Sequence, residues 1–285
     1  AAAAGGLTGL AGRTPVSRSV LWTILWEYGL GAHFGFFPLP LALYILTEAC
    51  RGLDAAHRAG EAEQAYFLLQ LVLETLLCPE VQTNVPDASL VRDPDALLSP
   101  LRASEVWSHL STTPAARRQR PSRASETHAA APALVLAGAY PKFHHGVVKA
   151  LSEAMPTDVV SLGELDKRFS HLALSPREVR ERLRRAEGQD VQPDELLAET
   201  FKGREYIFID WCDKGALAAS MWAPREARLV IRFHGADTLQ GWQLLVDWSR
   251  IDALVFTSKH LQSAVNATLG AQITDIEQHV VCLLY

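Results

Sequence analysis

Polar and titratable side chains follow four of the apolar runs in the second half of the chain. They lie at residues 138–146, 210–213, 234–237 and 258–260, and they include histidine, aspartate, lysine and serine. Imidazole and carboxylate groups can hydrogen-bond sugar-like hydroxyls and exchange protons with them. If the apolar runs are parallel strands, their carboxyl ends meet at one edge of a sheet, where such folds bind ligands. The sequence therefore predicts a cleft for a polar ligand.

Short apolar runs alternate with helical segments from residue 133 onward. The expected strands are 133–137, 157–162, 206–210, 228–233, 252–257 and 280–284, and the expected helices include 147–155, 215–222 and 259–269. A further helix begins after Ser175, with Pro176 at its first position and Glu178 completing a capping box. This alternation predicts right-handed βαβ units and an α/β fold with a Rossmann-like parallel sheet and flanking helices.

The first part of the chain has a different texture. Residues 1–15 are low in complexity and are expected to be disordered, and residues 16–110 are expected to be an all-α region. Residues 111–132 are rich in Ala, Arg and Pro and are expected to be a disordered linker. The alternative for this linker is an arm that contacts phosphate or a membrane. We find no catalytic constellation in 16–110, whose role the sequence does not indicate.

Composition restricts the class of protein. The net charge of −5 over 285 residues argues against a nucleic-acid partner. Four separated cysteines indicate a reducing compartment. No uninterrupted apolar run reaches the roughly 20 residues of a membrane span, and no signal peptide is recognisable. These features predict a cytoplasmic protein, with residues 20–49 as a buried helical hairpin in preference to a membrane-associated one.

Three segments in the second half resemble a known family. The segments RFHGADT, IDALVFTSKHLQSAV and HVVCLLY occur in this order and at plausible spacing. Together they are similar to the acceptor-side, N-terminal domain of retaining GT-B glycosyltransferases (group 1, family 4-like), over roughly residues 133–285. The resemblance implies transfer of a sugar from a nucleotide-sugar donor to a carbohydrate or lipid-linked acceptor. It implies neither a cofactor nor a metal.

The resemblance also implies roles for individual residues. His234 would line the reaction centre as the catalytic residue, and the alternative is a histidine hydrogen-bonded to the loop backbone. Gly146 would let the donor phosphates approach the following helix. The family usually has two glycines together, whereas this chain has His144-His145-Gly146, and His144 and His145 become candidates for substrate binding. Adjacent histidines in a loop diverge, and no third ligand stands at a recognisable spacing, so we predict no metal site.

The remaining candidates follow from the residues themselves. Asp210 and Asp237 could bind sugar hydroxyls or could cap neighbouring helices. Arg232 lies within a strand and is expected to form an ion pair inside the fold. Ser258 is expected to cap the helix 259–269, since no GxSxG elbow surrounds it.

The sequence leaves more than one function open. A glycosyltransferase of this type needs a second, donor-binding domain, and we expect the chain to be a fragment that lacks it. A non-catalytic sugar- or protein-binding α/β domain with a helical interaction module is one alternative. An NAD(P)-dependent oxidoreductase is another, although GxGxxG does not follow the first strand. The helical region could contact a membrane surface or a protein.

Overall fold

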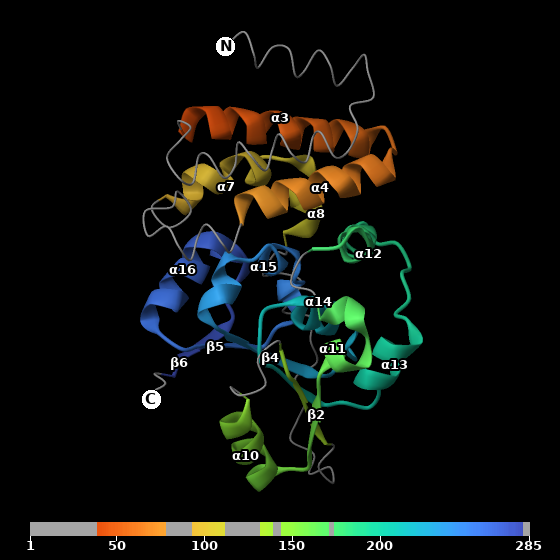
Figure 1. Ribbon diagram of the computed structural model, residues 1–285, viewed down its shortest axis with the longest axis vertical. Coiled ribbons are helices and arrows are strands. Elements are labelled where there is room, and N and C mark those ends of the chain that lie inside the picture. The colour runs from red at the N-terminus through yellow and green to blue at the C-terminus, as the bar shows by residue number, and fades with distance from the viewer. Residues whose placement is uncertain (1–38, 78–92, 112–131, 139–143, 171–173, 282–285) are drawn as a thin grey trace. The chain divides into compact units, whose positions relative to one another are not determined.

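The computed structural model describes residues 39–77, 93–111, 132–138, 144–170 and 174–281 (Figure 1). These residues belong to two compact units, one helical and one α/β. The segment 1–15 and nearly all of 111–132, both expected to be disordered, lie outside the described residues. No helix within the described ranges is long and apolar enough to cross a membrane.

The helical unit is built around a pair of packed helices. Its helices are α3 (Leu39–Arg58), α4 (Ala62–Leu76), α7 (Pro94–Arg102), α8 (Glu105–Leu110) and α12 (Pro176–Ala186). Helix α4 places Leu69, Val72 and Leu73 in the core, as the broad apolar face of this segment predicts. The expected helical region is therefore confirmed for its described part.

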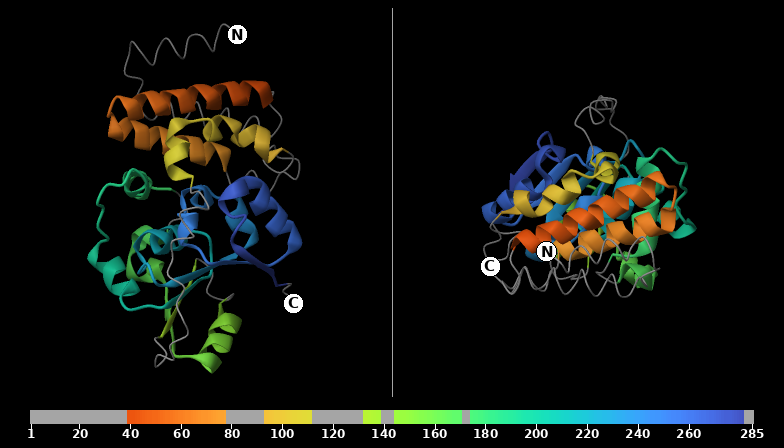
Figure 2. Two further views of the ribbon diagram at one scale, coloured as in Figure 1. Left: turned by 180° about the vertical axis from the view of Figure 1, so that it is seen from behind. Right: turned by 90° about the horizontal axis from the view of Figure 1, so that it is seen from above.

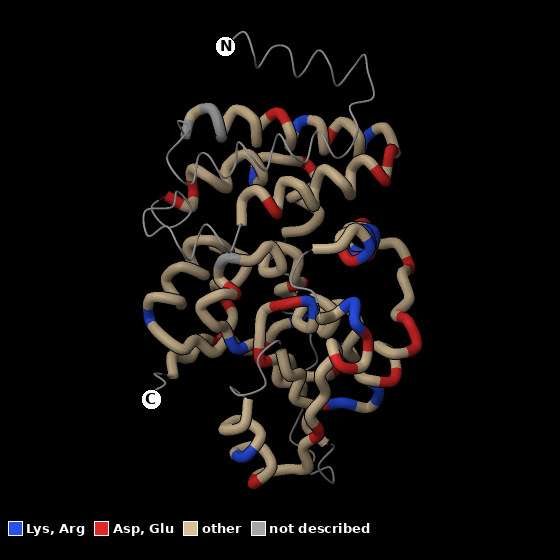
Figure 3. The backbone as a smooth tube through the Cα atoms, in the orientation of Figure 1, with Lys and Arg blue, Asp and Glu red and all other residues tan. Residues whose placement is uncertain are grey.

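Helix α12 lies between two strands in the sequence but packs against α4 and α8. It carries charges of both signs (Figure 3), yet Val179 and Leu183 are fully buried. The sequence pattern places this helix with the α/β region that begins at residue 133, so it does not predict this packing. The capping box expected at Ser175 does not form, because the Ser175 side chain makes no capping hydrogen bond. Pro176, whose ring fixes φ, occupies the first turn as predicted.

The α/β unit is a parallel sheet of six strands in the order β2-β1-β3-β4-β5-β6. The strands are β1 (Ala133–Leu136), β2 (Thr157–Val160), β3 (Tyr206–Ile209), β4 (Arg228–Phe233), β5 (Ala253–Phe256) and β6 (Glu277–Val280). Every neighbouring pair is parallel. The central strands are apolar because a parallel sheet is covered by its crossover helices. The predicted Rossmann-like α/β fold is confirmed.

The helices of this unit lie on both faces of the sheet. They are α10 (His145–Ala154), α11 (Leu162–Leu165), α13 (Glu195–Phe201), α14 (Lys214–Trp222), α15 (Trp242–Leu245) and α16 (Lys259–Leu269), with 3-10 turns at Lys167–Phe169, Gly235–Leu239, Trp248–Arg250 and Gly270–Gln272. Helix α10 lies on the face opposite to α14, α15 and α16 (Figures 1 and 2). This follows from right-handed crossovers, since the chain steps outward from β1 to β2 and then in the other direction from β3 onward. The strand order thus reverses between β1 and β3.

The sixth strand corrects the sequence prediction. Residues 280–284 were expected to form it, but β6 is Glu277–Val280, and 282–284 lie outside the described residues. The physical reason is that β6 is an edge strand, whose residues alternate between exposed and half-buried. A search for a continuous apolar run finds buried strands and misses such an edge. The second strand also ends early, because Leu162 begins α11.

Candidate functional site

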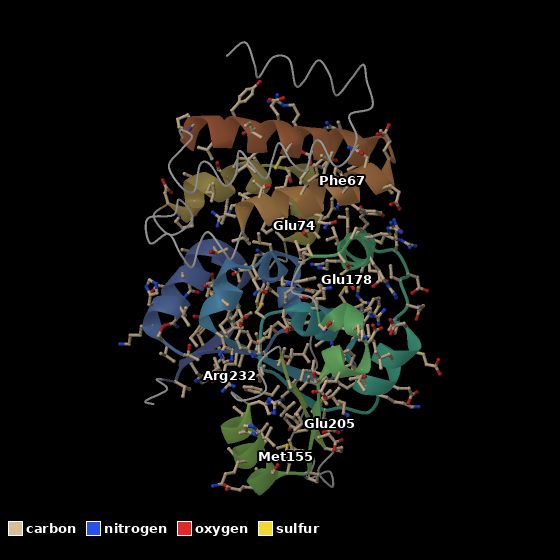
Figure 4. All side chains as sticks on the ribbon, in the orientation of Figure 1. Phe67, Glu74, Met155, Glu178, Glu205 and Arg232 are labelled. Atoms are coloured by element: carbon tan, nitrogen blue, oxygen red, sulfur yellow. The ribbon has the colours of Figure 1, made fainter. Side chains whose placement is uncertain are left out.

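A buried ion pair joins two neighbouring strands at the carboxyl edge of the sheet. Asp210 follows β3 and is 0% exposed, and Arg232 lies near the end of β4. The Arg232 Nε donates to Asp210 Oδ1 at 2.6 Å, and a second guanidinium nitrogen contacts the same oxygen. The guanidinium carbon also lies 5.7 Å from the ring centre of Phe208 (Figure 4 labels Arg232). The ion pair predicted for Arg232 within the fold is confirmed.

His234 is held next to this ion pair by contacts on its face and on its edge. Its ring stacks on Trp211 with the centroids 4.1 Å apart and the planes 12° apart. Its Nε2 lies 3.3 Å from Asp210 Oδ1, and its side chain is 8% exposed. The ring therefore lies within hydrogen-bond distance of a buried carboxylate. A carboxylate partner fixes the orientation of an imidazole ring.

Asp237 connects the loops that follow β3 and β4. Its Oδ2 accepts hydrogen bonds from the backbone N–H of His234 at 2.9 Å and from that of Cys212 at 3.1 Å. The side chain is fully buried, and this burial raises its pKa well above the ordinary value, although the two N–H groups oppose the shift. Sequence reasoning proposed Asp237 for hydroxyl binding or helix capping. The geometry shows that its carboxyl group positions His234 through the backbone.

Gly138 and Trp211 complete the packing around His234. A Cβ placed on Gly138 would lie 2.0 Å from Cδ1 of Trp211, so the indole occupies the space that any other side chain would need. Trp211 is thus held between the backbone after β1 and the ring of His234. Sequence reasoning did not single out either residue. The sequence does show a glycine soon after one strand and a tryptophan soon after another. That these two strands are neighbours, which brings the residues together, is known only from the fold.

The two adjacent histidines have different environments. His144 is 7% exposed, and its Nδ1 has no hydrogen-bond partner among the described residues. Burial lowers its pKa; the charge of Asp210 acts in the opposite direction, and His145 and Arg232 lower the pKa further. His145 is exposed and begins α10, with its ring centre 5.1 Å from that of His144. Only His144 is therefore held near the buried carboxylate.

Gly146 lies in the first turn of α10 and is exposed. No described atom lies within 4 Å of the position that a Cβ would take. The residue before the helix, His144, makes no side-chain capping bond, so it does not satisfy the first N–H groups. Glycine here leaves the helix N-terminus uncrowded by the described residues, and the His144 side chain does not cap its amides.

Replacement of Gly146 by alanine is expected to stabilise the chain by roughly 0.5 kcal/mol, because glycine loses more entropy in a helix. The measurement is urea unfolding of both proteins. A loss of more than about 1 kcal/mol would contradict the open environment of Gly146.

Asp213 caps α14 and carries a perturbed carboxyl group. Its Oδ1 accepts from the backbone N–H of Gly215 at 2.7 Å. Burial raises its pKa to about 6; hydrogen bonds from backbone N–H groups lower it, and the charge of Asp210 raises it. The neighbouring Lys214 donates from Nζ to the carbonyl of Arg168 at 2.7 Å. These contacts fix the start of α14 beneath the loop that carries Trp211.

The shift at Asp213 predicts a pH dependence of stability. A carboxyl group with a raised folded-state pKa binds more protons when folded, so its contribution to stability is lost as pH rises from about 4 to about 6. Asp213→Asn keeps the capping oxygen and removes this titration. The variant should gain roughly 1–3 kcal/mol relative to the native protein between pH 4.5 and pH 7.5. Urea unfolding of both proteins at the two pH values measures this stability difference. A difference that does not change with pH would argue against a raised pKa at Asp213.

Ser258 has the role that the sequence predicts for it. Its Oγ accepts from the backbone N–H of Leu261 at 3.2 Å and caps α16, which ends at Gly270. Gly270 has a φ of 54°, in the left-handed region that favours glycine. Ser258 is a structural residue.

The assignment of this chain rests on its fold. No group of three or more His, Cys, Asp or Glu side chains in the described ranges is arranged to hold a metal ion. Comparisons with protein-family models, with curated proteins and with solved structures find no match for this chain. The chain therefore has a Rossmann-like parallel α/β sheet preceded by a helical region, and its function is inferred from the site.

Proposed function

We propose that the α/β unit binds a sugar at the carboxyl edge of its sheet and is the acceptor-side half of a nucleotide-sugar glycosyltransferase. One observation carries this proposal: His234 is held between the Trp211 ring and the Asp210 carboxylate, next to the point where the strand order reverses. In open α/β sheets, the crevice at such a point is where ligands bind. The sequence segments around His234 supply the resemblance to glycosyltransferases.

The chemistry of the cluster suits a polyhydroxy ligand. Carboxylate oxygens accept hydrogen bonds from hydroxyls, and imidazole can donate or accept. The Trp211 ring, buried against His234 and Gly138, serves to hold the imidazole in place. Because Asp210 and Trp211 restrict the His234 ring, its contribution to binding would cost little conformational entropy. His234 would then orient a hydroxyl of the transferred sugar or of the acceptor.

The start of α10 supports a place for donor phosphate in the same proposal. Its uncapped first turn presents N–H groups and the positive end of the helix dipole, which favour anions. Gly146 leaves that approach open. The resemblance implies that most of the nucleotide would be bound by a donor-side domain, so we expect the α/β unit by itself to bind nucleotide sugars weakly.

Binding experiments on the chain test the proposal. In calorimetric titrations, UDP- or GDP-sugars or neutral saccharides should bind and NAD(P) should not bind. His234→Ala should weaken that binding about tenfold or more, the equivalent of about 1.4 kcal/mol. His260→Ala is the matched control, because His260 is exposed at the start of α16 beyond the neighbouring strand β5.

Each alternative has its own result in this experiment. Binding of NAD(P) without any sugar ligand would favour the oxidoreductase and would overturn the proposal. Failure of every ligand to bind would favour a non-catalytic interaction module. If His234→Ala and His260→Ala weaken ligand binding equally, His234 does not belong to the binding site.

A further inference from the structure

Several buried polar atoms at the carboxyl edge, Oδ1 of Asp237 among them, lack a hydrogen-bond partner among the described residues, and two of these belong to Asp210 and His144. These two are Oδ2 of Asp210, whose side chain is fully buried, and Nδ1 of His144, which is 7% exposed. Leaving a buried polar atom without a hydrogen bond destabilises the folded protein. Such atoms therefore mark places where a ligand or a water molecule completes the hydrogen bonding.

The two atoms belong to one region of the sheet. Asp210 directly follows β3, and its backbone N–H donates to the carbonyl of Leu136 at the end of β1, at 3.0 Å. His144 closes the loop that follows β1 and lies near enough to Asp210 and Arg232 for their charges to act on its imidazole. Both side chains are thus held where the strand order reverses.

The charges of the region favour an uncharged group. The Asp210 carboxylate is already balanced by Arg232, which contacts its other oxygen. An anion next to Oδ2 would face the negative carboxylate, and the Arg232 guanidinium is already paired with that carboxylate. The anion would therefore lose its hydration without gaining a positive partner. One hydroxyl can donate to Oδ2 and accept from an Nδ1–H, and it would satisfy both atoms at once.

We propose that Asp210 and His144 form a subsite for one uncharged hydroxyl of the bound saccharide. This rests on the proposed function and specifies which part of the ligand the site recognises. The subsite is separate from the contacts that the His234 ring makes. It assigns a binding role to His144, the buried one of the two adjacent histidines.

Variants of the two adjacent histidines test the subsite. Binding of methyl hexosides to the full chain is measured by saturation-transfer NMR. His144→Ala should weaken the best-binding hexoside about tenfold. His144→Asn should stay within about threefold of the native protein, because its amide can place a polar atom near the position of Nδ1. His145→Ala should leave binding unchanged, since His145 is exposed.

A deoxy series of the same hexoside then identifies the hydroxyl. Removal of the hydroxyl that enters the subsite should weaken binding to the native protein about tenfold but should have little further effect on His144→Ala. Non-additivity of this kind shows direct contact. Circular dichroism spectra of the variants should match that of the native protein, because His144 makes no capping bond.

The possible failures separate the two proposals. If nucleotide sugars bind but no neutral hexoside binds at millimolar concentration, the subsite is wrong and the proposed function stands. If hexosides bind equally to His144→Ala and to the native protein, the unpaired atoms hold only water and the subsite is likewise wrong. If no sugar ligand of either kind binds, both proposals fail.

Discussion

Replacement of Arg232 by methionine is expected to destabilise the α/β unit by about 3–5 kcal/mol. Arg232 and Asp210 are both buried and share a hydrogen-bonded ion pair. Removal of the guanidinium leaves the Asp210 charge without a partner in the interior, and that uncompensated charge is the source of the cost. Because the protein has two compact units, hydrogen exchange of the β4 amides is a better measure than a single unfolding transition.

Two further variants test the cause of this loss. Arg228→Met lies on the same strand but at an exposed position, and it should change stability by less than about 0.5 kcal/mol. Adding Asp210→Asn to Arg232→Met removes the stranded charge and should restore part of the lost protection. A loss below about 1 kcal/mol in Arg232→Met would mean that the ion pair does not organise this edge of the sheet.

Replacement of Gly138 by alanine is expected to have the second large effect. The added Cβ would lie 2.0 Å from Trp211 Cδ1 and within 2.8 Å of its Cβ, so the indole or the backbone after β1 must move. Overpacking of this kind typically costs 1–3 kcal/mol. Since Trp211 stacks on His234, the displacement should also release the His234 ring.

The measurement for Gly138→Ala is NMR of the histidine ring protons together with urea unfolding. The ring-current shift that Trp211 imposes on His234 should disappear, and stability should fall. Gly146→Ala is the matched control, because a Cβ there meets no described atom within 4 Å. Unchanged His234 signals in Gly138→Ala would show that the stack does not depend on the close approach at Gly138.

The elements that the sequence predicts best are those defined by local physics. Strand β4 and helix α16 have the expected limits, because a continuous apolar run defines the strand and Ser258 and Gly270 mark the ends of the helix. Strand β6 was misplaced because its residues are half-exposed at an edge of the sheet. The packing of α12 on α4 and α8 was missed, since it depends on contacts between residues far apart in the sequence.

For the candidate site too, the sequence predicts local features and misses contacts between residues far apart in the sequence. Position after a strand is a local property, and it predicts that Asp210, His234 and Asp237 lie at one edge of the sheet. Which of them pairs with Arg232, stacks on Trp211 or is fully buried depends on the order of the strands. Asp237 shows the difference, because only the fold reveals that one of its carboxyl oxygens accepts the backbone N–H groups of Cys212 and His234.

The most direct test of the central claim is chemical-shift mapping of a bound saccharide on the isotopically labelled chain. The account predicts that the largest changes occur at the Trp211 indole, the His234 and His144 rings and the backbone after β3 and β4. These changes should saturate together with one dissociation constant. Changes confined to the helical unit, or to the edge formed by β6, would place the ligand elsewhere and would contradict the assignment of the site.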